Sequence, residues 1–412
     1  MSGVLIVGAG QGGFQLAASL REAGYAGPVR LLGDEPGLPY QRPPLSKAFL
    51  KGEADAAQLE LRPAAFYADH SIEMLHGRAV AIERAERRVR LADGTALDYE
   101  HLVLATGARN RPLPVKGADL DGVFYLRTLA DAQALKARLA AARQVVVVGA
   151  GFIGLEFAAV ARALGHEVTV VEATLHPMGR AVSPIMSAFF AEAHRAMGTR
   201  LVLSAGVVAL HGRDGQVTGV EAADGALHPG GGTVYPADLV VVGIGVVPNA
   251  ELAAEAGLEV RNGIVVDETL ATADPAISAL GDAVSYPSVH AGLTVRLESV
   301  QNAADQARCL AHRLTGNALP YAAVPWFWSD QADLKLQIVG LAAPTDSAVL
   351  RGDPASRRFS VFRFHERRLT AIESVNRPAD HMLGRRLLAG RPGLTPEEAA
   401  DESFELKSLL AR

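Results

Sequence analysis

Residues 145–172 read VVVVGAGFIGLEFAAVARALGHEVTVVE, and this stretch decides the fold. An apolar run stops at Gly149, and Gly149, Gly151 and Gly154 follow the spacing G-x-G-x-x-G. Small and apolar residues then recur at helical spacing, and a second apolar run ends at Glu172, about twenty residues after the glycines. This order of strand, glycine turn, helix, strand and terminal acid predicts a βαβ unit that binds a dinucleotide.

Each glycine of this pattern, and the acid that ends it, has a physical reason. Gly149 permits the tight turn, Gly151 lets a pyrophosphate approach the backbone, and Gly154 lets helix and strand pack closely. The helix N-terminus offers free N–H groups and the positive end of its dipole to phosphates. Glu172 can accept hydrogen bonds from both ribose hydroxyls and would repel a 2′-phosphate, which predicts NADH rather than NADPH. A buried βαβ unit without a ligand is the alternative.

The same signature opens the chain. An apolar run at residues 4–7 leads into closely spaced glycines, and a second apolar run at residues 29–32 precedes two acids. Two nucleotide-binding folds predict two dinucleotides, one held permanently and one exchanged. The glycines are Gly8, Gly10, Gly12 and Gly13, and the acids are Asp34 and Glu35. Because both Gly12 and Gly13 are glycine, the sequence leaves open which of them meets the phosphate.

Length, charge and cysteine content restrict the function. A chain of 412 residues is expected to form two or three domains. The formal net charge of −5 gives no sign of nucleic-acid binding. Cys309 is the single cysteine, which excludes an internal redox disulfide, a thiolate zinc site and a built-in iron–sulfur cluster. No metal site is expected, and the absence of a long apolar run or leader favours a cytoplasmic protein.

A proline-rich segment, PGLPYQRPPLSKAFLKG at residues 36–52, follows the first nucleotide motif. It cannot be one long helix, although residues 45–47 are expected to start a short one. It contains Arg42 and Lys47, and its rigid position makes Lys47 a candidate functional residue. A solvated surface lysine is the alternative.

Several further segments end in turns where a cofactor can approach. Residues 272–282 are expected to form a strand that ends on a glycine and an aspartate, which suits a sugar hydroxyl, with an ordinary turn aspartate as the alternative. Residues 296–308 are expected to contain a helix after Glu298 and Val300, and its N-terminus can point at a cofactor ring. The candidates at these ends are Ala105, Thr106, Gly107, Gly243, Gly245, Asp282, Glu298 and Val300, and Arg180 lies in the loop after Glu172.

A family resemblance rests on the order of these motifs. The chain reads GAGQGG, PYQRPPLSK, ATGAR, GAGFIGLE, GIGVVPN, LGD, RLESVQNAADQA and WFWSDQ. This order resembles the FAD-dependent NADH:ferredoxin reductases of bacterial oxygenase systems over essentially the whole chain. The pair PYQRPPLSK and WFWSDQ is more specific than either nucleotide motif.

The resemblance implies an α/β fold like that of glutathione reductase, without the redox disulfide. Two Rossmann-like dinucleotide-binding domains, for FAD and for NAD, are followed by a C-terminal α+β domain. The expected boundaries are residues 1–112 and 246–318 for a discontinuous FAD domain, 113–245 for the NAD domain and 319–412 for the C-terminal domain.

The resemblance also assigns residues to the cofactors. The FAD site is expected to contain Gly8, Gly10, Gly12, Gly13, Asp34, Glu35, Arg42, Lys47, Val80, Ala105, Thr106, Gly107, Arg127, Asp282, Glu298, Val300 and Trp328. The NAD path is expected to contain Gly149, Gly151, Phe152, Ile153, Gly154, Glu156, Glu172, Arg180, Gly243 and Gly245. Lys47 and Glu156 lie in motifs that converge near the reacting flavin atom, so an ion pair between them is the expected catalytic pair.

The expected reaction passes electrons from NADH through FAD to a two-iron two-sulfur ferredoxin that serves an oxygenase. Trp328 is expected near the exit, either as part of the electron path or as a packing residue. An acidic partner would need local basic residues, and Arg308, Arg385 and Lys407 are the candidates. The alternatives are a rubredoxin reductase, another NADH oxidase or quinone reductase of this fold, and a redox-sensing binding protein resembling apoptosis-inducing factor.

Overall fold

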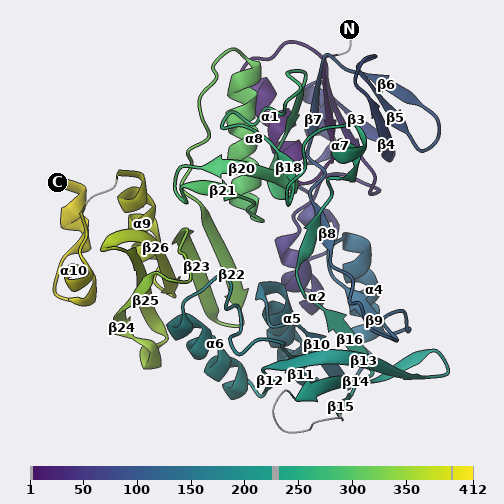
Figure 1. The fold of residues 1–412 in the computed structure, drawn as a ribbon. Helices are drawn as coiled ribbons and strands as arrows, with labels where there is room; N and C mark the ends of the chain where they lie inside the picture. Colours follow the sequence, from purple (N-terminus) through teal and green to yellow (C-terminus); the bar gives the residue numbers. More distant parts are fainter. Residues whose placement is uncertain (1–2, 225–231, 391–392, 412) are drawn as a thin grey trace. The chain divides into compact units, whose positions relative to one another are not determined.

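The computed structural model describes residues 3–224, 232–390 and 393–411, which divide into two compact units (Figure 1). Unit 1 comprises residues 1–41, 59–109 and 247–327, and unit 2 comprises residues 42–58, 110–246 and 328–412. Each unit therefore gathers three separate stretches of the chain.

A parallel five-stranded sheet forms the centre of unit 1, in the order β19-β7-β1-β2-β3. Its inner strands are almost completely buried, as expected where helices cover both faces of a parallel sheet. Helices α1 and α8 pack against each other. These elements are β1 (Val4–Val7), β2 (Val29–Gly33), β3 (Ile72–His76), β7 (His101–Leu104), β19 (Ile277–Ala279), α1 (Gln11–Glu22) and α8 (Val300–Leu314).

Two small three-stranded sheets complete unit 1, in the orders β4-β5-β6 and β18-β20-β21. The strand expected at residues 272–282 is limited to β19, because Thr272 and Asp274 form a hydrogen-bonded turn before it. The helix expected in the segment 296–308 after Glu298 and Val300 is present as α8, which begins at Val300 and is capped by Ser299. The remaining elements are β4 (Ala79–Glu83), β5 (Arg88–Leu91), β6 (Ala96–Asp98), β18 (Ile264–Val265), β20 (Val284–Ser288), β21 (Leu293–Val295), α3 (Ala64–Asp69), α7 (Glu251–Glu255) and η3 (Gly281–Ala283).

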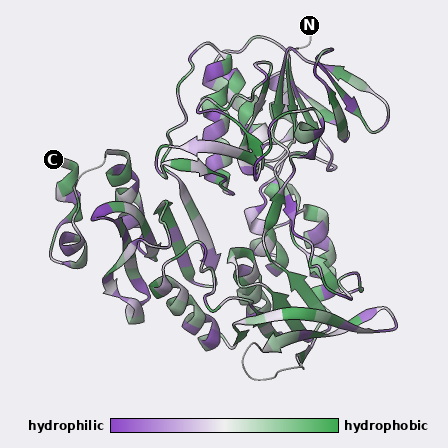
Figure 2. Ribbon diagram, viewed as in Figure 1, coloured by the Kyte–Doolittle hydropathy of each residue, from purple (hydrophilic) through white to green (hydrophobic). Residues whose placement is uncertain are grey.

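Unit 2 contains a second parallel five-stranded sheet, in the order β12-β11-β10-β16-β9. Figure 2 shows its central strands β10, β11 and β16 as hydrophobic, in agreement with their burial. Its strands and helices are β9 (Val123–Tyr125), β10 (Gln144–Val148), β11 (Glu167–Val171), β12 (Arg200–Val202), β16 (Leu239–Val242), α4 (Leu129–Leu139), α5 (Phe152–Ala163) and α6 (Pro184–Ala196). A three-stranded antiparallel sheet follows, with β13 (Ala205–Arg213), β14 (Gln216–Asp224) and β15 (Thr233–Pro236).

The proline-rich segment contributes η1 (Pro43–Ser46), α2 (Ala48–Lys51) and η2 (Ala57–Leu59). Lys47 lies between the two helical turns with a non-helical backbone, so the short helix expected at residues 45–47 is interrupted there. Strands β8 (Ala108–Asn110) and β17 (Val246–Pro248) pair with each other.

The C-terminal part of the chain forms an antiparallel sheet in the order β22-β23-β26-β25-β24. Helix α9 packs on strands β23 and β26. The elements are β22 (Trp326–Gln331), β23 (Leu334–Gly340), β24 (Ser347–Asp353), β25 (Arg358–His365), β26 (Arg368–Val375), η4 (Pro354–Ser356), α9 (Pro378–Gly390), α10 (Pro396–Ala400) and η5 (Leu406–Ala411). Within the described residues, every helix is too short or too polar to cross a bilayer.

Candidate functional site

Two glycine turns lie at the carboxyl ends of the two parallel sheets, and their geometry is the same. Gly8 and Gly149 have φ values of +113° and +99°, which favour glycine. A Cβ on Gly13 would lie 1.9 Å from the Gly8 carbonyl oxygen, and one on Gly154 would lie 2.3 Å from the Gly149 carbonyl oxygen. In both turns the first and last glycines are therefore required by the backbone itself.

The middle glycine of each turn borders open space. A Cβ on Gly10 would meet no atom within 4 Å, and one on Gly151 would meet only the Gly243 carbonyl oxygen, at 3.8 Å. A Cβ on Gly12 would lie 2.5 Å from the Leu280 side chain. Gly12 and Gly13 are thus packing positions, and Gly10 is the position whose missing side chain leaves room beside the turn.

The helices that follow these turns begin without a side-chain cap. Gly10 and Gly151 are the N-cap residues of α1 and α5, and neither first turn contains an acid. By contrast, Thr128, Ser183 and Ser299 cap α4, α6 and α8 through their hydroxyls. Open space, uncapped N–H groups and a positive helix end fit a pyrophosphate at each turn. The residues present therefore fit one dinucleotide in each unit.

The acid after the second strand is held by hydrogen bonds in each unit. Glu172 Oε2 accepts from the Ala150 backbone N–H at 2.7 Å, and Oε1 accepts from the N–H and the hydroxyl of Thr174 at 2.8 Å each. In unit 1 the Tyr40 hydroxyl donates to Glu35 Oε2 at 2.5 Å. Asp34 is exposed. Between Asp34 and Glu35, the oriented carboxylate is that of Glu35.

Further candidates of unit 1 lie near the first glycine turn. A Cβ on Gly8 would lie 2.2 Å from the Ala105 carbonyl oxygen, so the end of β7 approaches the turn closely. Asn249 holds this strand end through two hydrogen bonds. Its side-chain amide donates to the Thr106 backbone carbonyl oxygen at 2.9 Å, and its backbone carbonyl oxygen accepts from the Thr106 hydroxyl at 2.6 Å. Gly107 has a φ of +65°.

The candidates on the other elements of unit 1 are more dispersed. Asp282 lies in η3 beside Gly281, whose N–H donates to the Gln306 side chain at 2.7 Å. Glu298 forms a 2.7 Å ion pair with Arg296, and Val300 begins α8. Val80 lies on β4 with 41 % of its surface exposed.

The NAD candidates of unit 2 lie at the second glycine turn. The Gly243 carbonyl oxygen would lie 2.5 Å from a Cβ on Gly149, and Gly245 has a φ of +98°. The Arg180 guanidinium would lie 3.6 Å from a Cβ on Gly245. Phe152 and Ile153 begin α5, and Ile153 is 42 % exposed. The strand end, the glycine turn and the Arg180 loop thus form one site.

The ion pair expected between Lys47 and Glu156 is present in the structure. Lys47 Nζ lies 2.8 Å from Glu156 Oε2, and the Glu156 side chain is only 5 % exposed. Arg42, in the same proline-rich segment, donates to the Arg127 carbonyl oxygen at 2.5 Å. These four residues and Trp328 of β22 belong to unit 2, whereas the other FAD candidates belong to unit 1.

Two serines that the sequence analysis did not assign complete the surroundings of Glu156. The Ser46 hydroxyl donates to Glu156 Oε2 and the Ser329 hydroxyl donates to Oε1, each at 2.7 Å. Both serines are buried. They stand directly before Lys47 and directly after Trp328 within the two most specific motifs, which is the signal that could have identified them.

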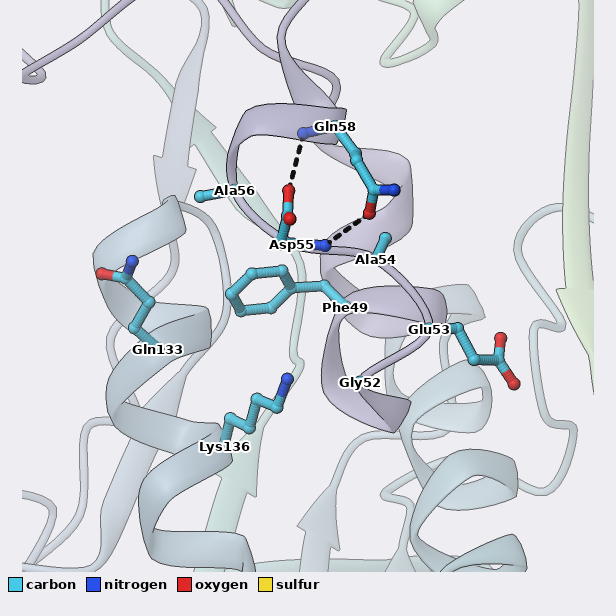
Figure 3. A pocket seen from close by; sticks show the side chains of 9 residues that line it. All are labelled: Phe49, Gly52, Glu53, Ala54, Asp55, Ala56, Gln58, Gln133 and Lys136. Carbon is cyan, nitrogen blue, oxygen red and sulfur yellow. Dashed lines mark hydrogen bonds between the residues drawn. The ribbon is translucent and has the colours of Figure 1, made fainter.

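A pocket outside this site lies between the α2 region and α4, and Figure 3 shows its lining residues. The Lys136 ammonium lies 4.9 Å from the centroid of the Phe49 ring. Asp55 and Gln58 bond each other's backbone N–H groups at 2.9 Å, which closes the turn above the ring. None of the nine lining residues is a candidate for either cofactor.

Two parallel sheets, each with a glycine turn that fits a pyrophosphate, define a two-dinucleotide oxidoreductase. The family model "Pyridine nucleotide-disulphide oxidoreductase" matches residues 2–307, and "Reductase C-terminal" matches residues 326–410. The chain belongs to the pyridine nucleotide-disulphide oxidoreductase family, and it uses FAD and NAD(H). With Cys309 as the single cysteine, it cannot form the internal disulphide after which the family is named.

Similar proteins extend over almost the whole chain. Rhodocoxin reductase of Rhodococcus erythropolis is 53 % identical over 410 residues, which cover 99 % of this chain and 94 % of the relative. The crystal structure of the ferredoxin reductase for the CYP199A2 system from Rhodopseudomonas palustris is 52 % identical, with a TM-score of 0.96 and 99 % of both chains covered. The putidaredoxin reductase in its covalent complex with putidaredoxin is 41 % identical, with a TM-score of 0.95, covering 100 % of this chain and 98 % of that one. The expected glutathione-reductase-like fold class is confirmed.

Proposed function

We propose that this chain is an NADH-dependent flavoprotein reductase that passes electrons to a two-iron two-sulfur ferredoxin serving an oxygenase. The observation that carries the proposal is full-length similarity, at 52 % identity, to a ferredoxin reductase of a named oxygenase system. The local chemistry agrees, because the glycine turns and the Lys47–Glu156 ion pair are all present. Bound FAD would accept a hydride from NADH and release the electrons one at a time.

The residues of this chain would bind and orient the two cofactors. Gly10 and Gly151 leave room for the pyrophosphates, and Glu35 and Glu172 hold the riboses. Lys47 would balance negative charge on a bound reduced flavin, and Glu156 would hold the ammonium in place. Phe152, at the start of α5, would shield bound flavin from solvent in the absence of nicotinamide. Trp328 either carries electrons toward the partner or packs against the flavin.

The domain organisation follows the same proposal. Residues 1–112 with 246–318 form the FAD domain, residues 113–245 the NAD domain, and residues 319–412 the C-terminal domain. The match of one family model through residue 307 and of another from residue 326 supports a boundary near residue 319. The protein acts in the cytoplasm, where NADH and small ferredoxins are available.

Two measurements test the cofactors. The purified protein should be yellow, and acid precipitation should release FAD into the supernatant, because no covalent link is expected. Anaerobic mixing with NADH should bleach the flavin absorbance in a stopped-flow instrument. A folded protein that takes up no FAD would refute the proposed function.

A panel of acceptors tests the partner. Steady-state NADH oxidation is followed with two-iron two-sulfur ferredoxins, rubredoxins, quinones and oxygen in parallel. We expect the ferredoxins to give the highest kcat/KM. A higher value with rubredoxin would favour the alternative rubredoxin reductase, and a higher value with oxygen or quinone would favour an oxidase or quinone reductase. Reduction of no acceptor beyond slow oxygen turnover would favour the redox-sensing binding protein.

A further inference from the structure

A chain of buried polar side chains leads from Glu156 along β22 to His194 of α6. The Ser329 hydroxyl donates to Glu156 Oε1 at 2.7 Å, and Gln331 Nε2 lies 3.2 Å from Ser329 Oγ. Gln331 Oε1 lies 2.9 Å from His194 Nε2 on α6. Ser329, Gln331 and His194 have no exposed surface, so these contacts form away from water.

The carboxylate determines the direction of every hydrogen bond in this chain. As the partner of Lys47, the Glu156 carboxylate only accepts, so the Ser329 hydroxyl must donate to it. Ser329 Oγ then accepts from the Gln331 amide, which turns the Gln331 carbonyl oxygen toward His194. His194 must therefore hold its proton on Nε2. All three donors point toward Glu156.

The surroundings of His194 agree with this assignment. Burial lowers the pKa of His194, so the ring is neutral near pH 7 and holds one proton. Its Nδ1 atom is buried without a hydrogen-bond partner among the described residues. An unpaired acceptor is tolerated more readily than an unpaired donor, which also favours the proton on Nε2.

The two Glu156 oxygens differ in how they are held. Oε2 has two partners, the Lys47 ammonium and the Ser46 hydroxyl, whereas the bond to Oε1 comes from Ser329. Hydrogen bonds in a buried chain polarise one another, so the amide and the imidazole strengthen the bond from Ser329 to Oε1. Without the bond from Ser329, the Glu156 carboxylate could rotate about its Cγ–Cδ bond and displace the Lys47 ammonium.

We propose that Ser329, Gln331 and His194 are positioning residues that hold the Glu156–Lys47 pair in the geometry needed for flavin reduction. The inference rests on the proposed function, because it assumes that this pair acts during hydride transfer. It deepens that function by assigning a role to the WFWSDQ motif, which reaches Glu156 through Ser329. The role is distinct from that of the adjacent Trp328.

The kinetic test measures the limiting rate of flavin reduction in substitution variants of the FAD-loaded full chain. Ser329→Ala should lower the limiting rate of flavin reduction by NADH about tenfold, which is less than the roughly hundredfold loss that a full 1 Å misplacement of a catalytic group can cause. The Kd for NADH should change less than about twofold. Gln331→Met removes the amide but leaves Ser329 in place, so it should give a smaller decrease in the same rate.

Ser360→Ala is the matched control. Ser360 is equally buried in the same antiparallel sheet, and its hydroxyl also donates to a carboxylate, Asp380 Oδ2, at 2.8 Å. The control should lose stability without a loss of limiting rate. Equal slowing in Ser329→Ala and Ser360→Ala, or no slowing in Ser329→Ala, would overturn the positioning role.

A second measurement needs no turnover. Long-range proton–nitrogen NMR spectra of the histidine-labelled holoprotein report which ring nitrogen of each histidine bears the proton, and His194→Gln assigns the signal. We expect His194 to be protonated on Nε2 and to keep this form between about pH 6 and 8, because it is buried. A proton on Nδ1 would reverse the donor chain and overturn the inference.

The two tests separate this inference from the proposed function. Wild-type protein that NADH does not reduce would refute the proposed function, and the inference with it. Wild-type protein that is reduced normally, together with an unchanged rate in Ser329→Ala, would refute the positioning role alone.

Discussion

The carboxylate of Glu172 is oriented by three hydrogen bonds from the protein itself. The glycine turn itself supplies one donor, the Ala150 N–H, and the following loop supplies two more from Thr174. A 2′-phosphate would therefore meet a negative charge that cannot easily turn away. This geometry gives a physical basis for the preference for NADH that the sequence predicts.

The Glu172→Gln variant tests this preference. The amide keeps one acceptor oxygen for the turn but removes the charge, so kcat/KM with NADPH should rise relative to NADH. Unfavourable charge at such a contact costs a few kcal/mol, which corresponds to roughly a hundredfold in the ratio. Steady-state kinetics with both nucleotides measure the ratio. Equal use of NADH and NADPH by the wild-type protein would contradict the assignment.

Lys47 and Glu156 should act as a unit. Lys47→Met and Glu156→Gln each remove one charge of a 2.8 Å pair, so each should lower the limiting rate of flavin reduction about tenfold or more. The double variant should be only slightly slower than either single variant, because the second change removes a group that has already lost its partner. Anaerobic stopped-flow measurements give all three rates. Normal rates in both single variants would make the pair structural.

The sequence predicts this pair but not the groups that hold it. Lys47 and Glu156 lie in recognisable motifs, and the fold brings those motifs together. Ser329 is separated from Glu156 by 173 residues, and their contact depends on how β22 packs near α5. Its position inside WFWSDQ marks Ser329 as a candidate, but a serine has many ordinary roles, so the motif alone does not show which group it contacts.

At the scale of elements, α6 is attached to the C-terminal sheet at both ends. At its N-terminus the Ser183 N–H and hydroxyl donate to Glu373 of β26, and the hydroxyl distance is 2.6 Å. Near its C-terminus His194 contacts Gln331 of β22. Glu373 also pairs with Arg363 at 3.0 Å, and both side chains are almost fully buried. Helix α6 therefore joins the parallel sheet of unit 2 to the antiparallel sheet.

Glu373→Gln tests this attachment. The amide keeps an acceptor for Ser183 but leaves the Arg363 charge buried without its carboxylate, which typically costs about 3–5 kcal/mol. The thermal unfolding midpoint should decrease clearly, while the FAD released per protein stays the same. Arg367→Gln is the control, because its pair with Glu397 is exposed and should contribute little. Equal midpoints for both variants would show that the buried pair does not hold α6.

Local patterns predicted some elements better than others. The βαβ units were predictable because a glycine turn and an alternation of apolar runs lie within about thirty residues. The order of the antiparallel sheet, in which β23 neighbours β26, depends on contacts between distant strands and leaves no comparable local signal. The strand expected at residues 272–282 was too long because residues 272–276 read TADPA, and the Asp-Pro pair starts a turn before the strand begins at Ile277.

At the scale of the whole molecule, an acidic ferredoxin needs basic residues on a protein with a net charge of −5. Arg385 and Lys407 are exposed on α9 and η5, which contact each other, whereas Arg308 lies on α8 in the other unit and pairs with Asp305 at 2.7 Å. Arg385 and Lys407 are therefore the better pair to change together.

The Arg385→Glu and Lys407→Glu double variant should slow ferredoxin reduction about tenfold and flatten its dependence on salt. Reduction of ferricyanide, which needs no docking surface, should change little. Arg261→Glu, at an exposed residue of unit 1, is the charge-reversal control. Equal losses with ferredoxin and ferricyanide would indicate damage to the flavin site, and no loss would place the docking surface elsewhere.

Two histidines with lowered pKa values should make the folded protein sensitive to mild acid. Burial lowers the pKa of His101 and of His381 to about 4 each, with smaller contributions from Arg313 and Arg385 respectively. The unfolded chain binds these protons near pH 6.5, so between pH 6.5 and 4 it holds more protons than the folded chain. Stability should therefore decrease as the pH falls through this window, by roughly 3 kcal/mol for each histidine at its lower end.

Thermal unfolding at about pH 7 and pH 5 measures this loss, and His381→Gln tests its origin. The variant cannot take up the extra proton, so its midpoint should decrease less between the two pH values than that of the wild type. His312→Gln is the control, because His312 is exposed and its removal should leave the wild-type pH dependence intact. Ordinary carboxylates titrate mainly below about pH 5, so they add little to the difference between pH 7 and pH 5. A His381→Gln midpoint that falls as steeply as the wild type would show that this histidine is already charged in the folded protein.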